Sequence, residues 1–196
     1  MSLDLAAFFT AEFAEHHDVA RRTEAALGDA FAALVKACVA SLKGGGKLMF
    51  FGNGGSAADA QHLATELTIR YKANRAALAA IALTTDTSAL TAAGNDLGFE
   101  RIFARQIEAL GKPGDVAIAI STSGKSPNVT AALQQAKTMR IVTAALTGKG
   151  GGDLPGLAEH VLLVPSGTTA RIQEMHIMLG QMLCGAIEIE LGLAAG

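Results

Sequence analysis

The sequence predicts a doubly wound α/β domain: a five-stranded parallel sheet flanked by helices, with long helices at the N-terminus and the C-terminus. Three observations predict this class. Five short runs are apolar throughout rather than alternating, as in strands that are covered on both faces. Segments whose apolar residues recur every three or four positions follow these runs. The connections between the two kinds of segment are short, which favours alternating β and α units in one sheet.

The first helical pattern covers residues 3–43. Its apolar residues, from Leu5 to Leu42, are spaced three and four apart. Gly28 interrupts the pattern, and we expect it to divide the run into two helices. Three consecutive glycines, 44–46, end the run. We take all 196 residues as one domain, because this length supports a proper core, with about 1–43 as its N-terminal helical extension.

Strand and helix patterns then alternate to the end of the chain. The predicted strands are 47–51, 79–83, 115–120, 141–146 and 160–164. The predicted helices are 56–71, 87–93, 99–110, 127–138 and 170–193. In this architecture, ligands bind beyond the carboxyl ends of the strands. The loops that leave those ends are therefore the expected place for a site.

Composition limits the partners of the chain. Half of the residues are hydrophobic and 17% are charged, so apolar helix faces are left over and we expect a homo-oligomer. The net charge is −2 without a basic run, which argues against direct nucleic-acid binding. We expect no membrane-spanning segment and no secretory signal. Cys38 and Cys184 lie outside any CxxC motif and are expected to be reduced core thiols of a cytoplasmic protein.

A glycine-rich loop, Gly52–Ser56, joins the first predicted strand to the next helix. Free backbone N–H groups and the helix dipole favour an anion at such a position. Gly52, Gly54 and Ala57 also satisfy the dinucleotide fingerprint G-x-G-x-x-A. That fingerprint requires an acidic residue at the end of the next strand, about 20 residues further on. Arg70–Lys72 occupy that position, so we expect no nucleotide cofactor.

A second loop, Ser121–Ser126, follows the third predicted strand and has hydroxyl side chains at four of six positions 121, 122, 123 and 126. Ser126 precedes Pro127 and is a natural N-cap, which explains this serine without any ligand. Capping does not explain the three hydroxyl residues that end the strand. A phosphate monoester would accept hydrogen bonds from several such donors. Lys125 is expected to be a solvent-facing helper.

Helix 56–71 carries the polar residues Asp59, His62 and Glu66 on one face. Ser56 and Asp59 suit a capping arrangement at its start. A histidine and a carboxylate four residues apart can bind a metal or hold a base beside a substrate. The alternative is a solvated polar face with an incidental ion pair.

The last predicted helix carries RIQEMH at 171–176 and then Gln181. Gln173 and His176 share a face of this helix. Taken alone, the pattern is equally that of an ordinary amphipathic helix.

Together, these motifs resemble the sugar isomerase (SIS) family. They are GNGGSAADAQH with Glu66, then AGND at 93–96, then STSGKS and RIQEMH, in this order over nearly the whole chain. The resemblance is to the single-domain branch that isomerises sedoheptulose 7-phosphate. It implies a homotetramer with active sites at subunit interfaces. It also implies conversion of that ketose to D-glycero-D-manno-heptose 7-phosphate, the first step toward the heptose of bacterial lipopolysaccharide.

The resemblance also assigns roles to individual residues. Glu66, together with Gln173, would serve the proton transfer between C1 and C2 through an enediol. Zinc would be held by His62, Glu66, Gln173 and the residue at position 181. The implied substrate contacts are Asn53, Gly54, Gly55, Ser56, Glu66, Asn95, Asp96, Ser121, Thr122, Ser123, Ser126 and Gln173.

Position 181 departs from the family pattern. The family has a histidine there, as zinc ligand and general acid, whereas this chain has Gln181. A neutral amide cannot give up a proton near neutral pH and is a weaker zinc ligand than imidazole. His176, on the same face as Gln173, is the alternative acid. Ala170 is a second departure, because some members have an aspartate there.

Two other functions remain open from the sequence. The first is a non-catalytic phosphosugar-binding or regulatory adaptor, like the relative that binds a replication initiator; Gln181 favours this reading. The second is an isomerase for another phosphorylated ketose, because a phosphate loop does not measure the length of the sugar.

Overall fold

The computed structural model describes residues 3–194 and contains one five-stranded sheet in the order β2-β1-β3-β4-β5. Every pair of neighbouring strands is parallel. The strands are β1 (Leu48–Gly52), β2 (Ala80–Ala82), β3 (Val116–Ser121), β4 (Val142–Thr147) and β5 (His160–Leu163). The predicted parallel α/β sheet is therefore confirmed.

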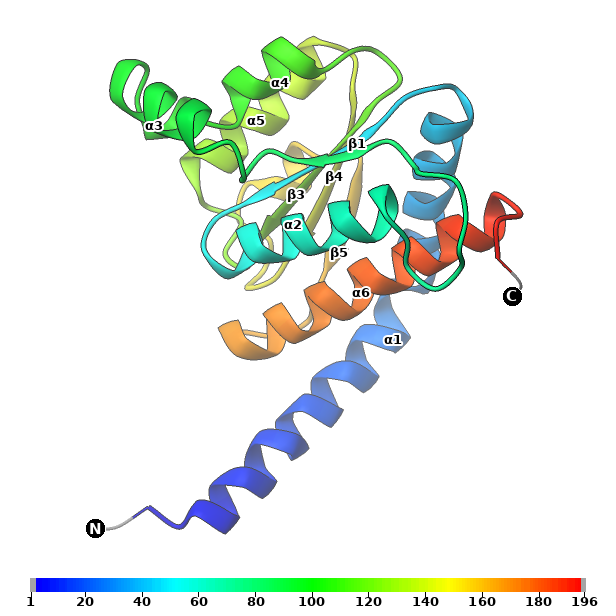
Figure 1. The fold of residues 1–196 in the computed structure, drawn as a ribbon. Coiled ribbons are helices and arrows are strands. Elements are labelled where there is room, and N and C mark those ends of the chain that lie inside the picture. Colours follow the sequence, from blue (N-terminus) through cyan, green and yellow to red (C-terminus); the bar gives the residue numbers. More distant parts are fainter. Residues whose placement is uncertain (1–2, 195–196) are drawn as a thin grey trace.

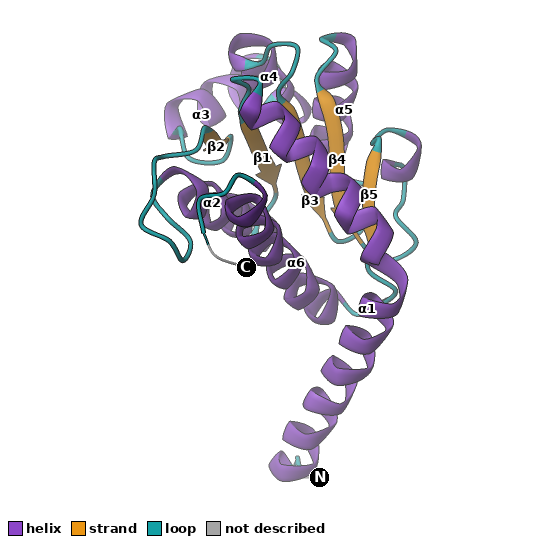
Figure 2. Ribbon diagram, turned by 90° about the vertical axis from the view of Figure 1, so that its right-hand side faces the viewer, coloured by secondary structure: helices purple, strands orange, loops and turns teal. Residues whose placement is uncertain are grey.

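Helices cover both faces of the sheet. They are α1 (Leu5–Lys43), α2 (Gly55–Thr68), α3 (Thr87–Asp96), α4 (Ala104–Leu110), α5 (Pro127–Thr138) and α6 (Thr169–Glu190), with 3₁₀ turns at Phe99–Arg101 and Leu154–Gly156. Helices α1, α2 and α6 lie on one face, and α3, α4 and α5 lie on the other (Figures 1 and 2). The sheet is thus the middle of three layers.

Each central strand contributes to two separate cores. In β1, Phe50 packs with α1, α2 and α6, whereas Phe51 packs with the opposite layer. In β3, Ile118 belongs to the first core and Ala119 to the second. All residues of both strands are buried. Burial on both faces is the reason that these runs are apolar without alternation.

The N-terminal run is one helix, α1, so the expected break at Gly28 is wrong. A single glycine costs a helix only about 1 kcal/mol relative to alanine, which the rest of a long helix can absorb. The C-terminal half of α1 packs against the sheet through residues such as Leu34 and Cys38, which are fully buried. The N-terminal half projects away from the body, as Figures 1 and 2 show.

By length and hydropathy alone, α1 also resembles a membrane-spanning helix, which the sequence reading did not anticipate. Such a match is weak support for a span, because a helix that packs on a core passes the same test. In α1, 33% of that apolar window is buried inside the protein, so packing on the core accounts for only part of the composition.

One further element differs from expectation. The predicted helix 99–110 is divided into the 3₁₀ turn Phe99–Arg101 and α4. Between them, Phe103 is buried and packs on Phe51, with ring centroids 5.6 Å apart.

Cys38 and Cys184 are free and buried, as expected, and burial raises the pKa of each thiol to about 12.

Candidate functional site

The two loops singled out in the sequence lie side by side at the carboxyl edge of the sheet. Strands β1 and β3 are neighbours, with Gly52 opposite Ile120 in the register. From β1 the chain enters α2 on one face, and from β3 it enters α5 on the other. The strand order also reverses between β1 and β3, and such a switch point leaves a crevice in which α/β proteins bind ligands.

The first loop, Gly52–Ser56, is built around close backbone contacts. A Cβ atom on Gly52 would lie 2.5 Å from the carbonyl oxygen of Ile120, so no larger residue fits there. Gly54 has φ of +57° and is the N-cap of α2, without a side-chain capping bond. Ser56 lies inside the helix and is buried, so the expected capping by Ser56 and Asp59 is wrong. The N-terminus of α2 therefore has no side-chain cap.

The second loop, Ser121–Ser126, uses some of its hydroxyls and leaves others free. The Oγ of Ser121 accepts a hydrogen bond from the N–H of Gly124 at 3.2 Å, and the Oγ of Ser123 accepts from that of Lys125 at 3.3 Å. Ser126 is the N-cap of α5, as expected, but its hydroxyl makes no capping bond. Hydroxyl hydrogens thus remain available to a phosphate oxygen in this loop.

A third loop, 148–152, supports the second loop from one side. A Cβ atom on Gly124 would lie 1.8 Å from the carbonyl oxygen of Gly151, and Gly124 has φ of +64°. The N–H of Asp153 donates to the carbonyl of Gly124 at 3.0 Å. A Cβ atom on Gly152 would lie 2.6 Å from the carbonyl oxygen of Gly124, so a glycine on each loop allows their close docking, a role that the sequence alone did not reveal.

Helices α2 and α6 bring three of the predicted residues into direct contact. The Nε2 of His62 lies 3.0 Å from Oε1 of Glu66 and 3.2 Å from the amide nitrogen of Gln181. The side chain of Glu66 is 22% exposed, so its carboxylate is reachable from solvent. Burial raises the pKa of Asp59, and the nearby His62 opposes that effect. Gln173 reaches the first loop, because a Cβ atom on Gly55 would lie 2.5 Å from its Nε2.

His176 does not join this cluster. It is fully buried, and neither ring nitrogen has a hydrogen-bond partner among residues 3–194. Burial lowers the pKa of His176 to about 4, and the nearby backbone of Thr147 offsets only part of this effect. The ring is therefore neutral near pH 7 and out of reach of a substrate, so the expectation that it could replace the missing acid is wrong.

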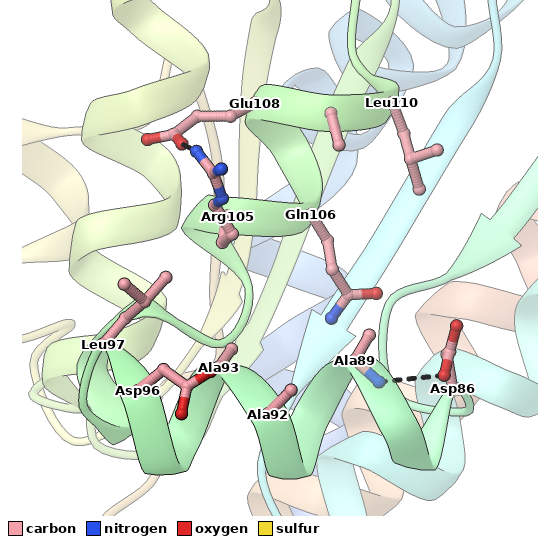
Figure 3. Close-up of a pocket in the computed structure, with 11 residues that line it drawn as sticks. Asp86, Ala89, Ala92, Ala93, Asp96, Leu97, Arg105, Gln106, Glu108 and Leu110 are labelled. Carbon is pink, nitrogen blue, oxygen red and sulfur yellow. Dashed lines mark hydrogen bonds and ion pairs between the residues drawn. The ribbon is translucent and has the colours of Figure 1, made fainter.

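Asn95 and Asp96 lie at the end of α3, on the opposite face of the sheet from α2 and α6 (Figure 1). The amide of Asn95 donates to the carboxylate of Asp96 at 2.7 Å, and both are exposed. Figure 3 shows Asp96 at the rim of a pocket of about 780 Å³ between α3 and α4, lined also by Arg105 and Gln106. Within one chain, these two residues are not brought to the cluster around Glu66.

The donor set at the cluster does not fit a zinc site. Catalytic zinc is held by three protein ligands drawn from histidine, cysteine and carboxylates. The predicted set here offers one imidazole, one carboxylate and two neutral amides, those of Gln173 and Gln181. In the described part of the chain, no group of three or more His, Cys, Asp or Glu residues could hold a metal ion.

An ion pair that was not predicted from the sequence holds the C-terminal end of α2 in place. Arg75 and Glu188, 113 residues apart, are joined at 2.9 Å and almost completely buried. Arg75 also donates to the carbonyls of Glu66 and Leu67. Burial opposes ionisation of Glu188, but the N–H groups of residues 71–73 and Arg75 hold its pKa below the ordinary value. The last turn of α2 is thereby tied to α6.

Comparison with known proteins gives consistent matches along the chain. Residues 13–148 match the family described as SIS domain. The chain is 59% identical to a phosphoheptose isomerase of Paramagnetospirillum magneticum, over 95% of this chain and 97% of that protein. It is 55% identical to one of Campylobacter jejuni, over 90% and 95%.

Solved structures agree with the sequence matches. A phosphoheptose isomerase from Neisseria gonorrhoeae has a TM-score of 0.89 at 43% identity, covering 94% of this chain and 99% of that one. Its counterpart from Francisella tularensis has a TM-score of 0.92 at 37% identity, covering 95% and 100%.

Proposed function

This chain belongs to the SIS domain family, and from that premise we propose that it is a phosphoheptose isomerase, converting sedoheptulose 7-phosphate to D-glycero-D-manno-heptose 7-phosphate. The observation that carries the proposal is the combination of a hydroxyl-rich loop at the end of β3 with a solvent-accessible carboxylate, that of Glu66, on the helix that leaves the neighbouring strand β1. Isomerisation needs both: a hold on the phosphate and a base at the other end of the sugar.

The phosphate is assigned to the second loop. Ser121, Thr122, Ser123 and Ser126 supply hydroxyls, and the N-terminus of α5 adds its dipole. Lys125 is exposed and is not needed as a fixed counter-charge. Binding energy from this remote group would position the reacting carbons beside Glu66.

The chemistry is a proton transfer between adjacent carbons. Glu66 removes a proton from C1 of the ketose, and the electron pair forms the C1–C2 double bond of an enediol. Return of the proton to C2 gives the aldose, while the hydroxyl proton moves from O1 to O2. Gln173 and Gln181 can donate hydrogen bonds to the oxygens as negative charge develops on them, although neither amide can give up a proton. No step of this scheme passes through a metal.

We propose that the protein is a homotetramer. Phe8, Phe9 and Phe13 are at least half exposed on the projecting half of α1. A mainly apolar groove of about 550 Å³ lies between α1 and α6, with Met178 and Met182 exposed beside it. Unpaired apolar surface of this kind favours association with further copies.

We also propose a cytoplasmic location, which fits two buried free thiols, and a role in supplying heptose for lipopolysaccharide.

The decisive experiment measures turnover of sedoheptulose 7-phosphate by NMR for the wild type and Glu66→Gln. Loss of the base should lower kcat by about 10²- to 10⁴-fold, while the binding of the phosphosugar is kept. Thr65→Ala, at an exposed neighbour on α2, is the matched control. Normal turnover by Glu66→Gln would refute the mechanism. Binding without turnover by the wild type would instead support the non-catalytic adaptor. The presence of Gln181 in place of the family's histidine is the observation in favour of that alternative.

A further inference from the structure

A reciprocal pair of side-chain amides joins the first loop to the start of α5, the helix that follows the second loop. Asn53, in the first loop, donates through Nδ2 to Oδ1 of Asn128 at 2.9 Å. Asn128, in the first turn of α5, donates back to Oδ1 of Asn53 at 2.8 Å. Asn128 is 2% exposed, so this pairing occurs largely out of water.

Such a pair fixes geometry more strictly than a single hydrogen bond. Each amide uses one donor and one acceptor on the other, so both planes and the distance between them are set together. Removal of one partner leaves a polar group without its hydrogen bonds in a half-buried position, and this costs free energy. Asn53 makes no other side-chain hydrogen bond within residues 3–194, so its orientation depends on Asn128.

We propose that Asn128 is a positioning residue that holds the first loop at a fixed distance and orientation relative to the second loop, Ser121–Ser126, which is the phosphate loop of the proposed function. The inference rests on the proposed function, in which Asn53 meets the sugar and the second loop meets the phosphate. Asn128 belongs to the helix that the phosphate loop caps, so it links these two contacts directly. The phosphate loop has its own support from Gly151 and Gly152. Loss of Asn128 should therefore loosen the first loop and leave phosphate binding largely intact.

The first test measures exchange of backbone hydrogens by mass spectrometry on the full-length protein without ligand. Asn128→Ala should increase exchange in a peptide that covers 52–56, with little change in β5. Asn128→Asp keeps an acceptor for the Nδ2 group of Asn53 and should give an intermediate result. Gln134→Ala, exposed on the same helix, should match the wild type.

The second test separates positioning from simple destabilisation. In Asn128→Ala, KM for sedoheptulose 7-phosphate should rise about tenfold, with kcat changed less than threefold and the affinity for inorganic phosphate changed less than threefold. Unchanged exchange at 52–56 together with unchanged KM would overturn the proposal. If the Asn128→Ala protein shows faster hydrogen exchange in all its peptides, the substitution has destabilised the whole fold. The Asn128→Asp protein then tests the proposal by the same criteria. If the wild type does not turn over the sugar, the proposed function fails, while exchange at 52–56 still decides the role of Asn128.

Discussion

Lowering the pH from 8 to 5 should destabilise the fold through one buried imidazole, that of His176. An unfolded chain protonates histidine with a pKa of 6.5, whereas burial lowers the pKa of His176 to about 4. Between these values the unfolded state binds a proton that the folded state does not, so the free energy of unfolding falls as the pH falls. At about 1.36 kcal/mol per pH unit, the full effect below pH 4 is on the order of 3 kcal/mol, and about 2 kcal/mol is already lost at pH 5.

The assay is urea unfolding followed by circular dichroism at several pH values and one protein concentration. His176→Leu removes the titrating group without breaking a hydrogen bond, because neither ring nitrogen has a partner in the described part of the chain. Other groups titrate in both proteins, so the difference between them isolates His176. The wild type should lose about 2 kcal/mol more than the variant between pH 8 and pH 5. His17→Gln, at an exposed site, should follow the wild type. Equal losses in the wild type and His176→Leu would refute the reasoning.

Two pairs of substitutions test the loops and the ligand set. Gly124→Ala would place a Cβ atom 1.8 Å from the carbonyl of Gly151, at a φ unfavourable for alanine, and should lower kcat/KM at least tenfold. Gly28→Ala meets nothing within 4 Å and should raise the free energy of unfolding by up to about 1 kcal/mol; an equal effect of both substitutions on kcat/KM would contradict this account. Gln181→His should add a third strong donor beside His62 and bind zinc in a metal analysis of the purified protein, whereas Gln181→Asn should not. Stoichiometric zinc in the wild type would show that the amides are adequate ligands.

The order of strands and helices could be predicted from the sequence because burial determines the pattern of apolar residues in each element. A run such as Val116–Ile120 is apolar on both faces, and few other structures need that composition. The two loops were identifiable for a similar reason, since glycine and hydroxyl residues at strand ends have few other uses. The continuity of α1 through Gly28 was not predictable, because it depends on packing that stabilises the helix elsewhere.

Contacts between segments that are distant in the chain could not be predicted from the sequence. Asn128 stands in an ordinary helical first turn, and only the adjacency of β1 and β3 brings it to Asn53. Arg75 and Glu188 are equally unremarkable in a linear reading. Local patterns determine elements, whereas these pairs depend on how the elements are arranged in space.

The position of β1 in the sheet also affects how the protein folds as it is synthesised. β1 ends at residue 52, but its neighbour β3 begins only at residue 116. While the ribosome makes the intervening segment, β1 can pair only with β2, and one apolar edge of it stays open. Folding that depends on such distant pairing is slow, and open apolar edges attract other chains. The nascent chain therefore exposes the β3-facing edge of β1 throughout the interval between the emergence of β1 and that of β3.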